Sequence, residues 1–230
     1  MNDDFTSRTR KVALITGASS GIGADLARVF ARFGHDLALV ARDRARLAAL
    51  ADEIAETGRP RPLVVALDLA GRSAPGELGA ALASGGVTVE ILVNNAGFGL
   101  VGRARELPVR DQIEMIDLNV RALTELTYHF LPDIIAAKGR IMNVASVAGF
   151  LPGPGMATYY ASKAYVVSLS AALAQELADD GVVVSALCPG PTPTGFQQRA
   201  GTDRALSERA PLTTSMQVAE AGYRGLMAGK

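Results

Sequence analysis

Three side chains in the middle of the sequence have the types and the spacing to protonate a carbonyl oxygen. Tyr159 and Lys163 are four residues apart, so on a helix they lie on the same face. Ser146 precedes the tyrosine by thirteen residues. A phenol is a weak acid at neutral pH, with a reference pKa of about 10. Because a neighbouring ammonium favours the phenolate, we expect Lys163 to lower the pKa of Tyr159.

Two further residues bear on this set, and the sequence leaves both open. Asn119 lies in a long helical pattern, where it either anchors a water leading from Lys163 to solvent or caps a local distortion of the helix. Tyr160 is three residues from the same lysine and is a competing phenol. Ser146 ends a predicted strand, and we expect its hydroxyl to bind the substrate oxygen.

A glycine-rich turn joins the first apolar run to a helical pattern. Glycines let the backbone turn tightly and approach a pyrophosphate, which the free N–H groups of a helix N-terminus bind. The spacing differs from the more common G-x-G-x-x-G, but its place after the first strand favours a nucleotide site. With the tyrosine, lysine and serine it predicts hydride transfer from a nicotinamide cofactor. The residues expected to contact the cofactor here are Gly17, Ser19, Ser20, Gly21, Ile22 and Gly23.

The end of the second apolar run indicates which cofactor is preferred. An acidic residue there would bind both ribose hydroxyls and favour NAD. This sequence instead has Ala41 followed by Arg42, whose guanidinium can bind a 2′-phosphate. We therefore predict NADP(H), with NAD(H) possible through Asp43. The alternative is that Arg42 is solvated and Asp43 caps the next helix.

Two more strand ends carry candidate cofactor residues. Asp68 and Leu69 end the third apolar run, where the carboxylate either accepts from the adenine amino group or caps a helix. Asn95, Ala96 and Gly97 follow the fourth run. An Asn side chain can tie neighbouring loops together, and Gly97 allows close approach to the ribose, although such residues are also ordinary turn formers.

These residues need an alternating α/β scaffold to bring them together. Six apolar runs are typical of strands covered on both faces, and helical patterns separate them, which predicts one doubly wound parallel sheet. The predicted strands are 12–16, 36–41, 63–67, 89–93, 140–145 and 182–187, and the predicted helices are 22–33, 45–57, 74–83, 109–137, 158–179 and 215–228. We expect a single domain over 1–230, disorder over 1–10 and a substrate loop at 191–214.

Composition excludes several other classes of protein. The 230 residues carry 23 basic and 23 acidic side chains, so no global field attracts nucleic acid or an anionic membrane. No run of apolar residues reaches the ~18 that a membrane span needs, and the first residues lack the apolar core of a signal peptide. One cysteine and two distant histidines favour no metal site. We expect a cytoplasmic protein.

From Lys11 to Thr194 the sequence resembles the short-chain dehydrogenase/reductase family. The motifs are TGxxxGIG at 16–23, Asp68, NNAG at 94–97, Asn119, Ser146, YxxxK at 159–163 and PG at 189–190 with Thr194 beyond. The resemblance implies that Tyr159, not Tyr160, is the acid/base. It implies that Lys163 binds the nicotinamide ribose, that Asn119 holds a relay water, and that Pro189, Gly190, Thr192 and Thr194 hold the nicotinamide amide. The segment 188–195 is similar to an NADP-type bacterial branch.

The expected activity is NADP-dependent reduction of a carbonyl or oxidation of a secondary alcohol. Two alternatives stay open: a 3-oxoacyl-thioester reductase of lipid synthesis, and a dinucleotide-binding sensor without turnover. Candidates for an apolar substrate wall are Phe98, Phe150, Leu151, Met156 and Phe196. We expect a homodimer or homotetramer. Because no apolar run follows 215–228, we expect six strands, without the further edge strand usual in the family.

Overall fold

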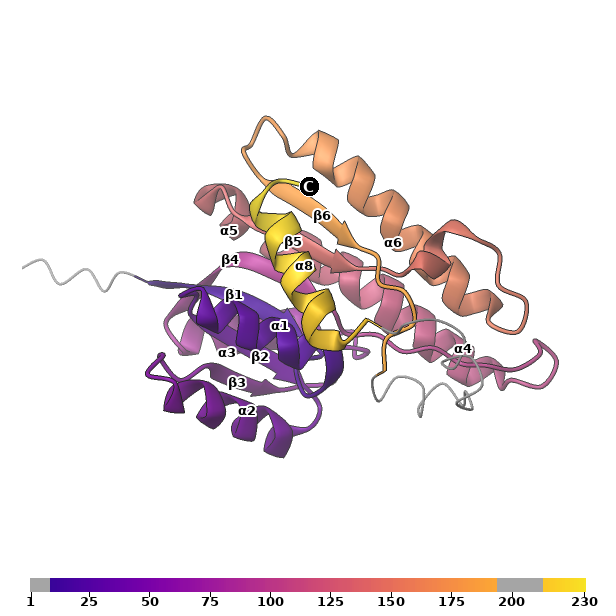
Figure 1. Cartoon of the computed structure of the whole chain (residues 1–230), viewed down its shortest axis with the longest axis horizontal. Coiled ribbons are helices and arrows are strands. Elements are labelled where there is room, and N and C mark those ends of the chain that lie inside the picture. Colours follow the sequence, from indigo (N-terminus) through magenta and orange to yellow (C-terminus); the bar gives the residue numbers. More distant parts are fainter. Residues whose placement is uncertain (1–8, 194–212) are drawn as a thin grey trace, which may run out of the picture.

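The computed structural model describes residues 9–193 and 213–230, and its centre is one parallel sheet of six strands (Figure 1). The strand order is β3-β2-β1-β4-β5-β6. The strands are β1 (Arg10–Thr16), β2 (Leu37–Ala41), β3 (Leu63–Ala66), β4 (Val87–Asn94), β5 (Arg140–Val144) and β6 (Val183–Leu187). All five residues of β2 are buried, as expected for a strand with helices on both faces. The predicted sheet is confirmed.

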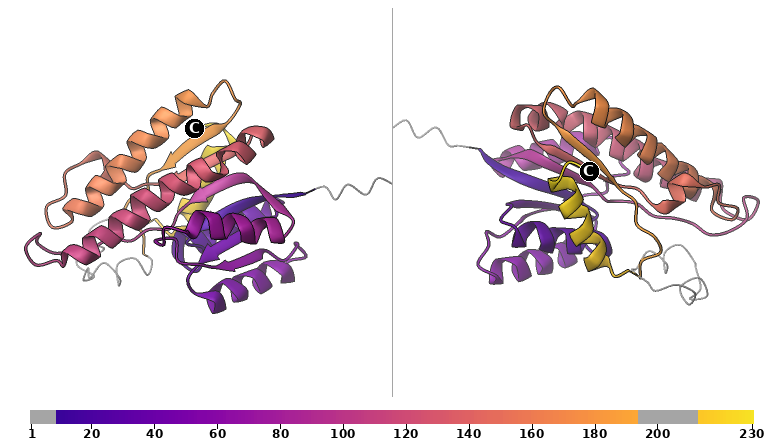
Figure 2. Two further views of the ribbon diagram at one scale, coloured as in Figure 1. Left: turned by 180° about the vertical axis from the view of Figure 1, so that it is seen from behind. Right: turned by 45° about the horizontal axis from the view of Figure 1, so that its top comes forward.

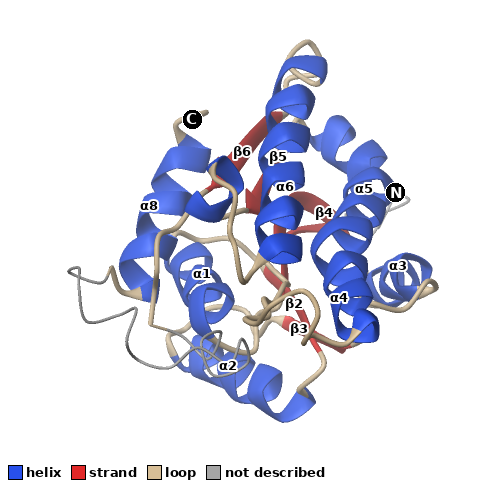
Figure 3. Ribbon diagram, turned by 90° about the vertical axis from the view of Figure 1, so that its right-hand side faces the viewer, coloured by secondary structure: helices blue, strands red, loops and turns tan. Residues whose placement is uncertain are grey.

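Two layers of helices cover the sheet, as the end-on view shows (Figure 3). One face carries α1 (Gly21–Arg32), α2 (Arg44–Glu56) and α8 (Ser215–Met227). The other carries α3 (Ala74–Ser84), α5 (Leu123–Ala137) and α6 (Ala157–Glu176), which stand in front when the molecule is seen from behind (Figure 2). Each layer has its own core, with Phe30 fully buried in the first and Leu126 in the second. Each such side chain contributes about 1.5–3 kcal/mol.

The long helix predicted over 109–137 is not regular. It is divided into α4 (Val109–Ile116), a π-helical turn η1 (Asp117–Ala122) and α5. Single π turns of this kind occur frequently at functional sites. Asn119 is in the middle of the turn and is buried. Of the two alternatives for Asn119, the local distortion of the helix is observed, and the prediction of one continuous helix over 109–137 is wrong.

Two of the predicted segments, the disordered residues 1–10 and the substrate loop at 191–214, can be compared with the structure only in part. Arg10 was expected to be disordered with the rest of 1–10, but it is the first residue of β1. Residues 1–8 and most of the predicted substrate loop lie outside the described residues, and so do Thr194 and Phe196. The strand order reverses between β1 and β4, which is the arrangement of a doubly wound Rossmann fold. Ligands of such sheets bind outside the strand carboxyl ends at this point of reversal.

Candidate active site

The glycine turn between β1 and α1 has a backbone that only glycine fits well. Gly17 has φ of +65°, in the left-handed region that disfavours side chains. A Cβ on Gly23 would lie 2.4 Å from the Gly17 carbonyl oxygen and 2.4 Å from Asn95 Nδ2. Ser20 is the N-cap of α1 but makes no capping hydrogen bond through its side chain, and no acidic residue lies in the first turn. The helix therefore directs N–H groups at this crevice, as a pyrophosphate site requires.

Thr16 and Asn95 join this turn to the loop that follows β4. The Thr16 hydroxyl donates to the Val93 carbonyl at 3.1 Å and accepts from the N–H groups of Asn95 at 2.9 Å and Ala96 at 3.0 Å. Asn95 Nδ2 donates to the carbonyls of Thr16 at 2.9 Å and Gly17 at 3.3 Å. The expectation that an asparagine ties neighbouring loops is confirmed.

The Asn119 side chain holds the next stretch of the same loop. Its Oδ1 accepts from the Phe98 N–H at 3.0 Å, and its Nδ2 donates to the Phe98 carbonyl at 2.9 Å. Nδ2 also donates to Ser162 Oγ at 3.1 Å, and Ser162 donates to the carbonyl of Tyr159 at 2.7 Å. The amide therefore connects the loop to α6, and both of its N–H groups are used. A Cβ on Gly97 would lie 2.9 Å from Asn119 Oδ1, so this glycine is needed for the close packing.

Tyr159, Lys163 and Ser146 come together where α6 passes the end of β5. Lys163 is only 6% exposed; its Nζ donates to the Val144 carbonyl at 2.8 Å and lies 5.9 Å from the centre of the Tyr159 ring. Ser146 follows β5 by two residues in an extended conformation and caps η2 (Val147–Phe150) by accepting from the Ala148 N–H at 3.1 Å. Its Oγ contacts the Pro189 carbonyl at 3.4 Å, and its side chain hydrogen-bonds Tyr159.

The electrostatics of this cluster differ from the expectation in one respect. Burial raises the pKa of Tyr159 above its ordinary value, and the hydrogen bond with Ser146 only partly opposes that shift. The predicted lowering by Lys163 is therefore wrong for the chain by itself. Burial also lowers the pKa of Lys163 to about 8, a shift that the nearby Cys188 thiol opposes. The cluster thus disfavours charge on both the phenol and the amine.

The competing phenol, Tyr160, packs against the loop that precedes α6. A Cβ on Gly153 would lie 2.3 Å from the Tyr160 ring, so this ring packs directly against the loop before α6. The rings of Tyr159 and Tyr160 meet edge to face at 6.2 Å. Lys163 Nζ lies over the face of the Tyr159 ring, 5.9 Å from its centre. The structure therefore places Tyr159, rather than its neighbour, with Lys163 and Ser146.

The remaining candidate cofactor residues lie around the same crevice. Arg42 is exposed at the end of β2, and among the described residues it makes no hydrogen bond or ion pair. Asp43 caps α2 by accepting from the Arg46 N–H at 3.0 Å, and it pairs with the Arg46 side chain at 3.3 Å. Asp68 is exposed and Leu69 is buried. Three others follow β6: Pro189, Gly190 and Thr192, the last with a hydroxyl that donates to the Gly190 carbonyl at 3.0 Å.

Three residues of this region were missed by the sequence reasoning. Ser162 was overlooked although it lies between Tyr159 and Lys163, and its hydroxyl connects Asn119 to the tyrosine's backbone. Cys188 lies close enough to Lys163 to affect its pKa. Arg121 donates a hydrogen bond to the Ala70 carbonyl in the loop after β3. Its position two residues beyond Asn119 was the sequence feature that could have drawn attention to it. Of the proposed substrate wall, Phe98 is buried, whereas Phe150 and Leu151 are exposed.

Residues 9–193 and 213–230 contain no cluster of histidine, cysteine, aspartate or glutamate that could hold a metal ion. Within the same ranges, no helix has both the length and the apolar character to cross a membrane.

The fold and the site together define a dinucleotide-dependent oxidoreductase. Comparison with known proteins identifies the family to which it belongs. Residues 11–205 match the short chain dehydrogenase family, and the chain belongs to that family. It is 39% identical over 210 residues to a sulfoacetaldehyde reductase of Chromohalobacter salexigens, covering 90% of this chain and 82% of that protein. The protein is accordingly an NAD(P)-dependent dehydrogenase/reductase that acts on CH–OH or C=O groups.

Solved structures of similar proteins contain either cofactor. A short-chain dehydrogenase from Sphingobium yanoikuyae in complex with NADPH is 37% identical and superimposes with a TM-score of 0.86, covering 96% of this chain and 85% of that one. A short-chain dehydrogenase/reductase from Burkholderia phymatum in complex with NAD is 30% identical with a TM-score of 0.86, covering 95% and 86%. Similar structures thus hold NADPH or NAD, and the preference of this protein has to be inferred from its own residues.

Proposed function

We propose that the protein transfers a hydride between NADP(H) and a carbonyl or secondary alcohol, with Tyr159 as the general acid and base. The observation that carries this is the meeting of Tyr159, Lys163 and Ser146 beside the glycine turn, with Lys163 Nζ 5.9 Å from the Tyr159 ring centre. A dinucleotide-binding sensor would need the turn but not this cluster. The set of three reactive side chains therefore favours turnover over sensing.

The residues have separate tasks in this proposal. The bound nicotinamide supplies or accepts the hydride. The Tyr159 hydroxyl donates the proton that the carbonyl oxygen needs, and takes it back in the oxidative direction. Ser146 Oγ hydrogen-bonds the same oxygen, since its contact to Pro189 is long at 3.4 Å and its orientation is fixed by the Ala148 N–H. Lys163, with a pKa of about 8, is largely an ammonium at neutral pH, and in this proposal it binds the nicotinamide ribose.

The residues that would hold the cofactor fit a dinucleotide. Gly17 and Gly21, with φ of +65° and +55°, let the backbone turn tightly into α1, and the N-terminus of that helix offers its N–H groups to a pyrophosphate. Gly97 and Lys163 would lie on the nicotinamide ribose, with Gly190 and Thr192 on the amide. Asp68 and Leu69 would form the adenine wall.

NADP(H) is the preferred cofactor in this proposal. Arg42 follows the end of β2, where a 2′-phosphate would lie, and its guanidinium makes no ion pair or hydrogen bond with residues 9–193 or 213–230. Asp43 is the residue through which NAD could compete, but its carboxylate is used by the N-terminus of α2 and by Arg46. An acid that caps a helix is poorly placed to accept from ribose hydroxyls as well.

The substrate is proposed to be an apolar carbonyl compound or the matching alcohol. Phe150 and Leu151, which follow Ser146 by a few residues, are 62% and 66% exposed, so apolar surface is available near the site. The 3-oxoacyl-thioester alternative requires a binding surface for a carrier or coenzyme, and no described feature favours it.

We also propose that the protein is at least a homodimer, through α4, α5 and α6. Four large apolar side chains on these helices are exposed: Val109 at 75%, Ile113 at 50%, Tyr128 at 52% and Tyr165 at 39%. A second copy would cover them. Light scattering after size exclusion should give at least twice the chain mass, and Ile113→Glu should give a smaller species; a monomeric wild type would contradict this.

The experiment for the function is a panel of ketones, aldehydes and acyl thioesters with NADPH and NADH, followed by cofactor absorbance. We expect turnover of apolar ketones or aldehydes with NADPH. Turnover of acyl thioesters alone would favour the lipid-synthesis alternative. Tight NADPH binding without turnover of any compound would favour the sensor.

A further inference from the structure

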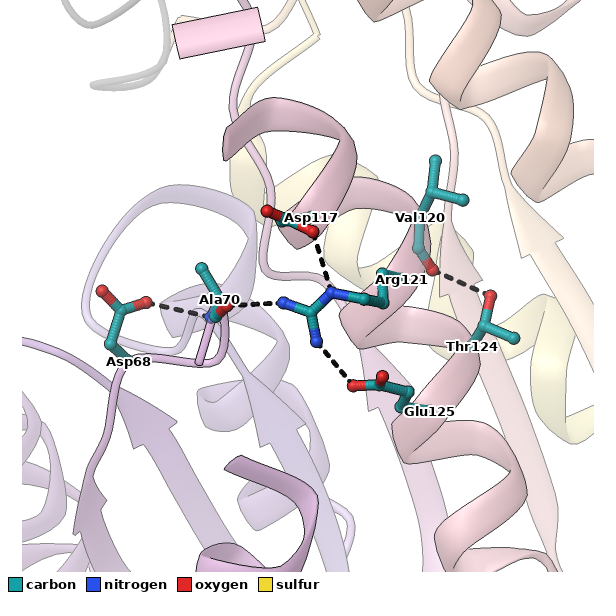
Figure 4. Close-up of polar contacts among 7 residues, drawn as sticks. All are labelled: Asp68, Ala70, Asp117, Val120, Arg121, Thr124 and Glu125. Atoms are coloured by element: carbon teal, nitrogen blue, oxygen red, sulfur yellow. Dashed lines mark hydrogen bonds and ion pairs between the residues drawn. The ribbon is translucent and has the colours of Figure 1, made fainter. Parts of the chain in front are cut away.

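Arg121 connects two segments that both carry residues of the proposed cofactor and catalytic sites. It belongs to the π-helical turn η1, two residues beyond Asn119. Its guanidinium reaches across to the loop between β3 and α3, where Nη2 donates to the Ala70 carbonyl at 2.5 Å (Figure 4). That loop carries Asp68 and Leu69, the proposed adenine wall.

The guanidinium is held in a fixed position by two carboxylates. Nε donates to Asp117 Oδ1 at 2.8 Å, and Nη1 donates to Glu125 Oε2 at 2.8 Å. The Arg121 side chain is 19% exposed, and the pKa of the guanidinium is raised above its usual range, first by its bond with Asp117. Because Asp117 and Glu125 fix the plane of the fork, the remaining nitrogen points to one place only.

The backbone of Ala70 is held through both of its flanking peptide groups. Its carbonyl accepts from Arg121, and its N–H donates to Asp68 Oδ1 at 3.0 Å. The position of the Ala70 backbone therefore limits where the exposed Asp68 carboxylate lies. In the other direction, η1 carries Asn119, which bonds the Phe98 backbone and, through Ser162, the backbone of Tyr159. One arginine thus links the loop of the proposed adenine wall to the turn that carries Asn119.

We propose that Arg121 is a positioning residue, which fixes the Asp68–Leu69 loop against the π turn and so sets the adenine side of the cofactor site. The inference rests on the proposed function, because it takes that loop as the adenine wall. An exposed ion pair within a helix would stabilise that helix slightly and would not affect cofactor binding. The contact with a loop carbonyl is what distinguishes Arg121.

Arg28 provides a matched control. It too is an arginine held by two carboxylates, with Nε 2.7 Å from Glu53 and Nη1 2.8 Å from Asp25, but it joins α1 to α2 and contacts no cofactor loop. The test compares Arg121→Gln with Arg28→Gln in three measurements. These are the dissociation constants of NADPH and of adenosine 2′,5′-bisphosphate by calorimetry, the free energy of unfolding in urea, and hydrogen exchange of residues 68–73.

Arg121→Gln should weaken both ligands by about three- to tenfold, as expected for losing one charge-assisted bond that orders a binding loop. Hydrogen exchange should become faster in residues 68–73. Arg28→Gln should lower the free energy of unfolding similarly but leave both dissociation constants within twofold, within the ordinary scatter of such effects. If Arg121→Gln does not fold, Arg121→Lys replaces it: an ammonium between the two carboxylates leaves Ala70 without its donor, so the same weakening is expected.

Different results would overturn the positioning role of Arg121 and the proposed function. If the wild-type protein binds NADPH and the bisphosphate, and the Arg121 variant binds them equally well, the positioning role is wrong and the proposed function stands. If the wild type binds neither ligand, the proposed function is wrong and the inference falls with it.

Discussion

Lys163→Met should stabilise the cofactor-free protein while removing its activity. Burial lowers the pKa of Lys163 from 10.5 to about 8, so at neutral pH the fold keeps an ammonium in a place that disfavours it. A shift of this size corresponds to about 3 kcal/mol at pH 7. Methionine fills a similar volume but loses the bond to the Val144 carbonyl, which costs about 1 kcal/mol. The net gain expected at pH 7 is about 2 kcal/mol.

The dependence on pH is the sharper part of this prediction. Below pH 8 the amine is protonated in both the folded and the unfolded chain, and the full cost of burying the charge is present. Between pH 8 and 10.5 the folded protein binds fewer protons than the unfolded one, so the wild type gains stability as pH rises. By about pH 9.5 roughly 2 kcal/mol of the difference between variant and wild type should be gone.

The assay is urea unfolding of both proteins at several pH values without cofactor. Lys11→Met is the control, because Lys11 is exposed and pairs with Glu90 at the surface at 3.3 Å. Its effect should not change over the same range. A difference between Lys163→Met and wild type that is constant with pH would refute the reasoning, since it would mean that Lys163 is not an uncompensated buried charge.

Two further predictions concern the cofactor crevice. Arg42→Ala should remove most of an NADPH preference that we expect to be at least tenfold in dissociation constant, or about 1.4 kcal/mol; equal affinities for NADPH and NADH in the wild type would contradict it. Gly23→Ala places a Cβ 2.4 Å from the Gly17 carbonyl oxygen, which is backbone and cannot turn aside. It should cost about 1–3 kcal/mol in urea unfolding and weaken NADPH, and a variant as stable as wild type would show that the turn is not tightly packed.

The fold could be predicted because its signals are local. Parallel strands with helices on both faces are largely apolar, so β2 and β3 are visible in the sequence as apolar runs, and the glycine turn marks the first strand end. The π turn at Asn119 was harder, since a helical pattern continues on both sides of it. It depends on bonds to Phe98 and Ser162, which are distant in sequence and come close only in the folded protein.

The site residues could be placed, but their electrostatics could not. Spacing put Tyr159 and Lys163 on one helix face and correctly predicted their proximity. It gave no measure of burial, and burial decides the direction of both pKa shifts in the chain by itself. Arg121 escaped notice for a similar reason, because its partner is a backbone carbonyl, which no sequence pattern marks.

The most direct test of the central claim compares Tyr159→Phe with Tyr160→Phe on the best substrate of the carbonyl panel. Both variants keep the ring and lose only the hydroxyl. If Tyr159 is the acid, its variant should lose at least about a hundredfold in kcat, while its NADPH dissociation constant stays close to that of the wild type. Tyr160→Phe should remain active, because its ring packs against Gly153. An active Tyr159→Phe beside an inactive Tyr160→Phe would contradict the account.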